Sequence, residues 1–336
     1  MTTPTEREKD RIRKVSALLH QACKPIRILR TLEWAPEVKE SFLAGGSREL
    51  PQVTYPSFDP TPSIELVREA RRLIVPFTTI DVWLERHALS IEMGARMLAS
   101  AGTPSFFEFG RQLYGEPDAP LRYVAITPLE LAQSVLAAIS QLTRIEISTA
   151  PPAYHGAEEV ARDLERAVGA HFGNQAPTIE LVDRLSANAL ATSRAIRIRR
   201  GARFTDRDFI QLLHHEAFIH VATSLNGKAQ TDLPLLAAGH PGTTRTQEGL
   251  AVFAEVISGS IELDRLRRLA DRVLAIQMAI EGADFLQVNA FFLERTGDPD
   301  QSFESTRRVF RGGVMTGGAP FCKDLVYLLG LLQVNN

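Results

Sequence analysis

Cysteine is nearly absent from this chain: Cys23 and Cys322 are the only two in 336 residues, and they lie far apart in sequence. So few cysteines exclude a disulfide framework and are typical of a reducing compartment. The sequence also lacks any apolar run long enough to cross a bilayer, and its first residues, MTTPTEREKD, lack the apolar region of a signal peptide. We therefore expect a cytoplasmic protein with no membrane partner.

An excess of charge of one sign is lacking as well. The 38 Lys and Arg residues nearly balance the 40 Asp and Glu residues, and the net charge of −2 gives no reason to expect a nucleic-acid partner. Hydrophobic residues make up 44% and charged residues 23%, which is ordinary for a soluble globular protein. A chain of this length forms one or two domains.

A proline-containing segment at 149–155, TAPPAYH, is the clearest internal boundary, because Pro151 and Pro152 interrupt any regular element. Before this segment the apolar residues recur at helical spacing. We therefore expect an N-terminal helical region at residues 1–150 and a catalytic region at 151–336, packed together as one compact unit.

The second region carries the strand signals. A helix is predicted at 157–171, followed by two strand-like runs at 179–182 and 195–199. The expected fold class is α+β, predominantly helical, with a small sheet beside a metal-binding helix.

Histidines cluster in one place. Of the eight histidines, His214, His215 and His220 fall within seven residues, and Glu216 directly follows His215 to give H-E-x-x-x-H. A further carboxylate, Glu248, lies in a downstream QEGLA segment. Two imidazoles, one carboxylate and an adjacent glutamate are the components of a catalytic zinc site, which has three protein ligands, an open water position and a base.

The spacing of the histidines makes a structural demand. His215 and His220 are five residues apart, and five residues of a regular α-helix rotate by roughly 500°, which leaves the side chains about 140° apart. A π-type turn would return them to a common face, and such turns often occur at functional sites. The sequence therefore predicts a π-turn between these two residues.

The third metal ligand has a rival. Glu255 lies seven residues after Glu248 and is either an alternative ligand or a partner of a ligand. Thr244 and Gln247 are expected to cap the helix here, which would put Glu248 near its first turn. His240 precedes this helix in a polar loop, where it would either stabilise a tetrahedral intermediate or simply be exposed.

The strand predicted at 195–199 immediately precedes the metal helix, which is expected to begin at Thr205 with Asp208 completing a capping box. In many zincins an edge strand lies above the metal and pairs with the extended substrate, and this strand is expected to take that place. Arginines are dense between 194 and 207. They would suit an acidic peptide, or equally protect a solvated sheet edge from aggregation.

The two motifs HHEAFIH and TQEGLA together resemble the QEGLA-motif family of metallohydrolases, whose bacterial members are described as flavohemoglobin expression-modulating. Its eukaryotic relatives are the microtubule-associated tyrosine carboxypeptidases, which remove the C-terminal tyrosine of α-tubulin. The resemblance implies that His215, His220 and Glu248 bind the metal and that Glu216 is the general base. It continues into three further segments, Pro25–Arg27, Arg311–Gly313 and Lys323–Asp324, and so covers most of the chain.

We therefore expect a zinc metallopeptidase with a zincin-like fold, acting as a carboxypeptidase on the acidic C-terminal tail of a peptide or protein. Such an enzyme must recognise a free α-carboxylate, which a fixed cation does well. The residues considered for this role are Arg311, Lys323 and Arg203.

Two other functions stay open. Two histidines and a carboxylate also form the site of a non-haem iron enzyme, although Glu216 beside the ligand favours hydrolysis. The second is a non-catalytic, metal-binding regulatory protein, but an open coordination position is not typical of a structural zinc site. The sequence leaves open the natural substrate, exo- or endopeptidase cleavage, and the oligomeric state.

Overall fold

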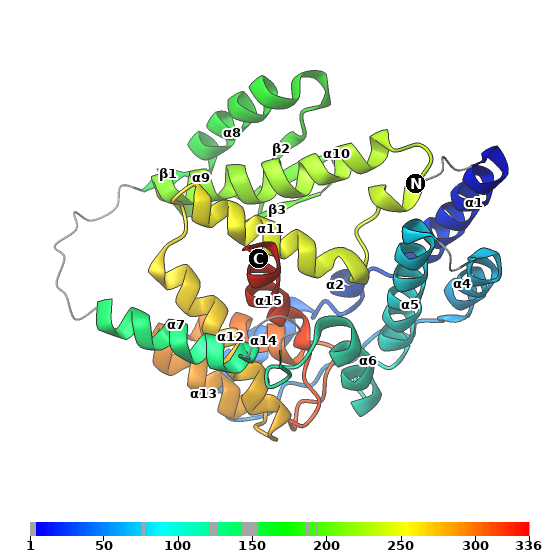
Figure 1. The fold of residues 1–336 in the computed structure, drawn as a ribbon. Coiled ribbons are helices and arrows are strands. Elements are labelled where there is room, and N and C mark those ends of the chain that lie inside the picture. Colours follow the sequence, from blue (N-terminus) through cyan, green and yellow to red (C-terminus); the bar gives the residue numbers. More distant parts are fainter. Residues whose placement is uncertain are drawn as a thin grey trace.

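The computed structural model describes residues 5–75, 78–120, 126–142, 154–183, 185, 188–192 and 194–335. These residues are mostly helical, with two small sheets (Figure 1). The expected α+β, predominantly helical class is confirmed for this part of the chain. None of its helices combines the length and the apolar character that a bilayer crossing needs.

The N-terminal part consists of helices. Thr5 caps α1 (Glu6–Cys23) in a capping box with Glu8. The buried face of α1 repeats at helical spacing through Val15 and Leu19. The helices that follow are α2 (Ile28–Thr31), α3 (Pro36–Ala44), α4 (Thr61–Leu73), α5 (Thr79–Ala99), α6 (Pro104–Tyr114) and α7 (Pro128–Leu142).

The small sheets follow next in sequence, beside α8 (Ala157–Phe172). In the three-stranded sheet, β2 (Thr178–Val182) runs parallel and β3 (Ala189–Ala191) antiparallel to the central strand β4 (Ala195–Arg199). A separate antiparallel pair joins β1 (His155–Gly156) to β5 (Arg203–Phe204). Both strand-like runs of the sequence are therefore strands.

One expectation about these strands is wrong. The strand at 195–199 is not an edge strand, because it is paired on both sides, and β3 forms the edge among the described strands. The sequence gives little sign of β3, which consists of only Ala189, Leu190 and Ala191. A strand of three residues without β-branched side chains has no recognisable sequence pattern. The sequence therefore did not predict β3 as the second partner of β4.

The rest of the chain is again helical. A continuous helical run consists of α9 (Asp206–Leu212), a π-helix (Leu213–Val221) and α10 (Ala222–Ala229). The elements after it are α11 (Pro241–Ile257), α12 (Leu263–Ile280), α13 (Phe285–Thr296), α14 (Pro299–Phe310) and α15 (Val326–Asn335). Short 3-10 helices are Gly173–Gln175, Pro234–Ala237 and Cys322–Leu325.

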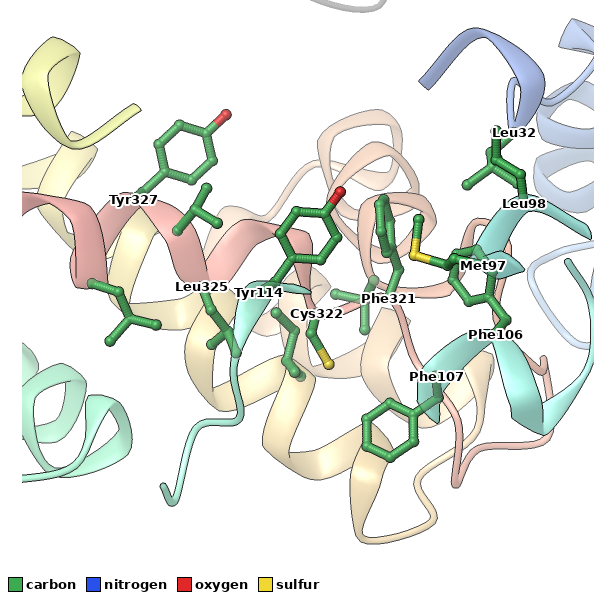
Figure 2. Packing of buried hydrophobic residues seen from close by; sticks show 14 of the residues in the cluster. Leu32, Met97, Leu98, Phe106, Phe107, Tyr114, Phe321, Cys322, Leu325 and Tyr327 are labelled. Atoms are coloured by element: carbon green, nitrogen blue, oxygen red, sulfur yellow. The ribbon is translucent and has the colours of Figure 1, made fainter. Parts of the chain in front are cut away.

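The largest hydrophobic core joins the first helices to the last ones. Phe106 and Tyr114 of α6 pack against Phe321, with ring centroids 5.3 and 5.7 Å apart (Figure 2). Two smaller clusters lie around α8 and the sheet. The boundary predicted at 149–155 falls mostly outside the described residues, and the division at residue 150 stays a prediction.

Helix α11 crosses the middle of the molecule, between the sheet with its helices and the lower helical layer (Figure 1). It packs against α15 on one side and the π-helix on the other. Residues of α11 therefore reach both the histidine segment and the C-terminal helix.

Candidate metal centre

The π-helix Leu213–Val221 brings the two histidines of the motif together. Thr205 and Asp208 form the predicted capping box at the start of α9, which leads into this segment. The rings of His215 and His220 lie with their centroids 4.9 Å apart. The π-turn predicted from their five-residue spacing is confirmed.

Glu248 approaches both rings from α11. Its Oε2 atom lies 3.8 Å from Nε2 of His215 and 3.8 Å from Nε2 of His220. The helix begins earlier than expected, because His240 is its N-cap and accepts the N–H of Gly242 on Nδ1. Glu248 therefore lies well inside α11 and not in its first turn. The expected start was too late because Thr244 is a more usual helix cap than a histidine.

These three residues could hold a metal ion. One ligand atom from each of His215, His220 and Glu248 lies within 4.8 Å of the others. Two imidazole nitrogens and one carboxylate oxygen suit zinc, and also non-haem iron. Ligands at about 2.1 Å around a tetrahedral zinc ion are roughly 3.4 Å apart, so the observed 3.8 Å separations need only a slight closing.

Both histidine rings have a partner on the nitrogen that faces away from Glu248. Nδ1 of His215 lies 2.7 Å from Oε1 of Glu255, and Nδ1 of His220 lies 3.4 Å from Oε1 of Gln247. Glu255 thus lies behind His215. Burial alone would raise the pKa of Glu255, but the hydrogen bond from His215 and the charge of Arg265 lower it to about 2.

Glu216 lies next to the edge strand. Its Oε2 atom accepts the backbone N–H of Ala191 at 2.9 Å. Residues 188 and 192 use their backbone groups on β4, so the alternate residue Ala191 presents its N–H to the free edge of β3. Among the described strands, none pairs with this edge of β3, so the glutamate of the motif lies beside an open strand edge.

A cluster of cations lies on the other side of Glu248. Nζ of Lys323 is 3.5 Å from Oε1 of Glu248. The same ammonium group lies 5.2 Å from the ring centroid of Tyr327, and Arg272 lies 5.6 Å from it. Arg308 donates to the Tyr327 hydroxyl at 3.4 Å.

Asp324 is the carboxylate that these cations share. It is paired with Arg308 at 2.6 Å, with Arg272 at 3.5 Å and with Lys323 at 4.0 Å. Burial opposes its ionisation, but the three cations hold the pKa of Asp324 well below its usual range. Three cations around one carboxylate leave this region, which we call the cationic cluster, with an excess of positive charge.

A comparison with protein families matches residues 40–336 to the family described as microtubule-associated tyrosine carboxypeptidase. The chain belongs to this family. The matched range contains every residue of the metal centre and of the cationic cluster. No curated protein matches the chain at a significant level.

In this member of the carboxypeptidase family, the three basic residues considered for substrate binding lie in different places. Lys323 is beside Glu248. Arg311 is buried after α14, with its guanidinium 5.8 Å from the ring centroid of Phe321 and no described partner for Nε. Arg203 is exposed on β5, 5.9 Å from the ring centroid of Tyr154, and makes no described contact with the three metal-binding residues.

Several residues around the site have no motif that identifies them. Gln247 is the exception, because it is the first residue of the QEGLA segment, but the sequence pointed to it as a helix cap and not as a partner of His220. The remaining residues come from α12, α14 and α15, and only the packing of these helices brings them together; they are Arg265, Arg272, Arg308 and Tyr327.

Proposed function

We propose that this chain is a zinc-dependent carboxypeptidase with a zincin-like active site, which removes a residue from the C-terminal tail of a peptide or protein. The observation that carries the proposal is the convergence of two histidines and Glu248 beside Glu216, in a chain that belongs to a carboxypeptidase family. Its two buried free thiols agree with a cytoplasmic location.

His215, His220 and Glu248 would hold the ion. Bound zinc would polarise the scissile carbonyl and lower the pKa of a bound water toward ~7. Glu216 would be the general base, accepting a proton from the attacking water and passing it to the leaving amine. Its hydrogen bond to Ala191 N–H fixes the carboxylate at the edge of the sheet, so the base is oriented before the substrate arrives.

The free edge of β3 would bind the tail in an extended conformation. Ala189 and Ala191 share the same edge because backbone groups alternate along a strand. A peptide that adds as a further strand gains main-chain hydrogen bonds without a demand on its side chains. A peptide bound in this way would lie with its backbone beside Glu216, and β3 would take the role first expected of the strand at 195–199.

The cationic cluster would bind the terminal α-carboxylate. Lys323 lies close enough to Glu248 to act at a terminal residue, and Arg308 and Arg272 extend the positive region behind it. Charge-assisted hydrogen bonds to a carboxylate are about twice as strong as neutral ones. The family name refers to tyrosine removal and to microtubules, so a tubulin-like acidic tail is the first substrate to test.

The same three metal-binding residues would suit a non-haem iron enzyme. Glu216 favours hydrolysis over this alternative, because an oxygenase has no need of a base held beside a histidine ligand. A purely regulatory role would leave Glu216 and the cationic cluster without a use.

The test is metal analysis of the purified protein followed by mass spectrometry of paired peptides. Each pair has one glutamate-rich sequence with either a free or an amidated C-terminus. We expect one zinc per chain and loss of the terminal residue from the free acid alone. Internal cuts, or equal cleavage of both peptides, would identify an endopeptidase; oxidation dependent on iron and oxygen would establish the iron enzyme instead.

A further inference from the structure

Helix α11 supplies more than the third metal ligand. Gln247 and Glu248 are adjacent, and Glu255 follows Glu248 by seven residues, a rotation of roughly 700° that returns it nearly to the same face. Glu248 faces Nε2 of both histidines, whereas Gln247 and Glu255 each face one Nδ1 atom. One helix therefore contacts both nitrogens of both rings.

We propose that Gln247 and Glu255 are positioning residues that hold the two histidine ligands with unequal strength, and that Arg265 belongs to the stronger side. This inference rests on the proposed metal site. It concerns how tightly each ring is held, and it assigns neither residue a contact with the substrate or the ion.

The His215 side is the stronger one. Glu255 is fully buried and lies 2.7 Å from Nδ1 of His215. An ionised carboxylate only accepts hydrogen bonds, so Nδ1 donates to Glu255, and Nε2, on the Glu248 side, is the nitrogen that would bind the ion. Arg265 fixes the same carboxylate from the other side, with contacts of 3.2 and 3.3 Å to its two oxygens.

The His220 side is weaker in each respect. Its acceptor is the neutral amide oxygen of Gln247, at the longer distance of 3.4 Å. The side chain of His220 is 25% exposed, compared with 9% for His215. A neutral, longer and partly solvated hydrogen bond holds a ring less firmly than a buried bond to a carboxylate. Of the two histidines, His220 is therefore the adjustable ligand.

The measurement is the zinc dissociation constant of the full chain, from competition with a chromophoric chelator. Residues that orient a metal ligand typically change affinity about 10- to 100-fold when replaced. We expect Glu255→Gln to weaken zinc binding toward the upper end of this range, and Gln247→Met toward the lower end. Arg265→Lys keeps the charge but loses the two-pronged contact, so its effect should be smaller than that of Glu255→Gln.

Gln247→Glu is the decisive variant, because it gives His220 a charged acceptor like that of His215. We expect it to bind zinc more tightly than the wild type and to shift the visible absorption of the cobalt-substituted protein. Thr246→Glu is the matched control: it adds the same charge to the neighbouring, exposed position of α11 without reaching Nδ1 of His220. If both variants bind zinc more tightly by the same factor, the added negative charge alone explains the effect, and the inference is overturned.

The outcomes separate the two proposals. A wild-type protein that binds no zinc contradicts the proposed function. A wild type that binds zinc, together with folded Gln247 variants of unchanged affinity and unchanged cobalt spectrum, contradicts only the positioning roles. Gln247 is partly exposed, so its variants keep the test valid even if the buried Glu255 variant does not fold.

Discussion

Gly249 of α11 and Gly330 of α15 cross backbone against backbone. A Cβ atom on Gly330 would lie 2.7 Å from Cα of Gly249, and a Cβ atom on Gly249 would overlap the carbonyl group of Gly330. Glu248 is adjacent to this crossing, and the segment with Lys323 leads directly into α15. The close approach of the two helices at Gly249 and Gly330 therefore determines how near Glu248 lies to Lys323.

Gly249→Ala is expected to destabilise the protein by about 1–3 kcal/mol, because the two helices must move apart to accept the methyl group. Urea unfolding measures this change. The control is Gly169→Ala in α8, where an added Cβ meets nothing within 4 Å. That variant should gain up to about 1 kcal/mol from helix propensity. Equal stability of both variants would show that α11 and α15 can move apart to accept the methyl group without destabilising the protein.

Glu248→Ala is expected to remove the zinc-dependent part of the stability. A ligand that binds only the folded state stabilises it by about 2.7 kcal/mol at a concentration 100-fold above Kd. Thermal unfolding with zinc and with a chelator should therefore differ for the wild type and coincide for Glu248→Ala. Glu281→Ala, at an exposed glutamate after α12, should behave like the wild type. A zinc response that survives in Glu248→Ala would assign the third ligand elsewhere.

Glu216→Gln is expected to keep the metal and the fold but to lose turnover by about 10²- to 10⁴-fold, the usual contribution of a general base. The amide oxygen can still accept the N–H of Ala191, so the edge strand should stay in place. Single-turnover kinetics together with metal content measure both properties. Near-wild-type cleavage by the zinc-loaded variant would rule out Glu216 as the base.

Sequence spacing was sufficient to predict those features that one segment determines alone. The five-residue interval between His215 and His220 required the π-turn, and the capping box at Thr205 determined where its helix begins. The start of α11 was predicted too late because His240 caps it through a ring nitrogen, which is an uncommon cap. In each case, the outcome depended on how clear the local signal was.

Features that need several segments were not predictable in this way. The central position of β4 depends on pairing with β3, a strand of three residues. The cationic cluster depends on the crossing of α12, α14 and α15, which no single periodicity encodes. Among the three basic residues considered from sequence, nothing local distinguished buried Lys323 from exposed Arg203.

Acid is expected to destabilise the fold through His240, the N-cap of α11, and His87 of α5, which packs against it. His87 and His240 are buried with their ring centroids 4.7 Å apart. Burial lowers the pKa of His87 from 6.5 to about 4 and that of His240 to about 3. Below pH 6.5 these two histidines bind protons in the unfolded chain but stay neutral in the folded protein. The free energy of unfolding is therefore highest above pH 6.5 and decreases toward pH 4.

The expected loss is roughly 2–3 kcal/mol per histidine by pH 4.5. His87→Phe keeps an aromatic ring against Trp83 and should remove about half of the pH dependence. Urea unfolding between pH 7 and 4.5, with a chelator present to exclude metal release, gives the slope. An unchanged slope in His87→Phe would mean that other groups cause the acid sensitivity.

Lys323→Met is expected to reduce kcat/KM for free-acid peptides by about 10- to 100-fold, the effect of losing one charge-assisted hydrogen bond of about 1.5–3 kcal/mol. The amidated peptide lacks the carboxylate and should stay uncleaved by the wild type and by each variant, so it serves as the negative control. Arg311→Met tests the buried arginine first considered for this role, and Arg203→Met is the exposed control on β5. Mass spectrometry of the paired peptides ranks the three variants.

If Arg311→Met reproduces the acid-specific loss and Lys323→Met does not, the α-carboxylate binds deeper, beside Phe321. An equal loss for Arg203→Met would place the tail along β5 and contradict the assignment of the cationic cluster.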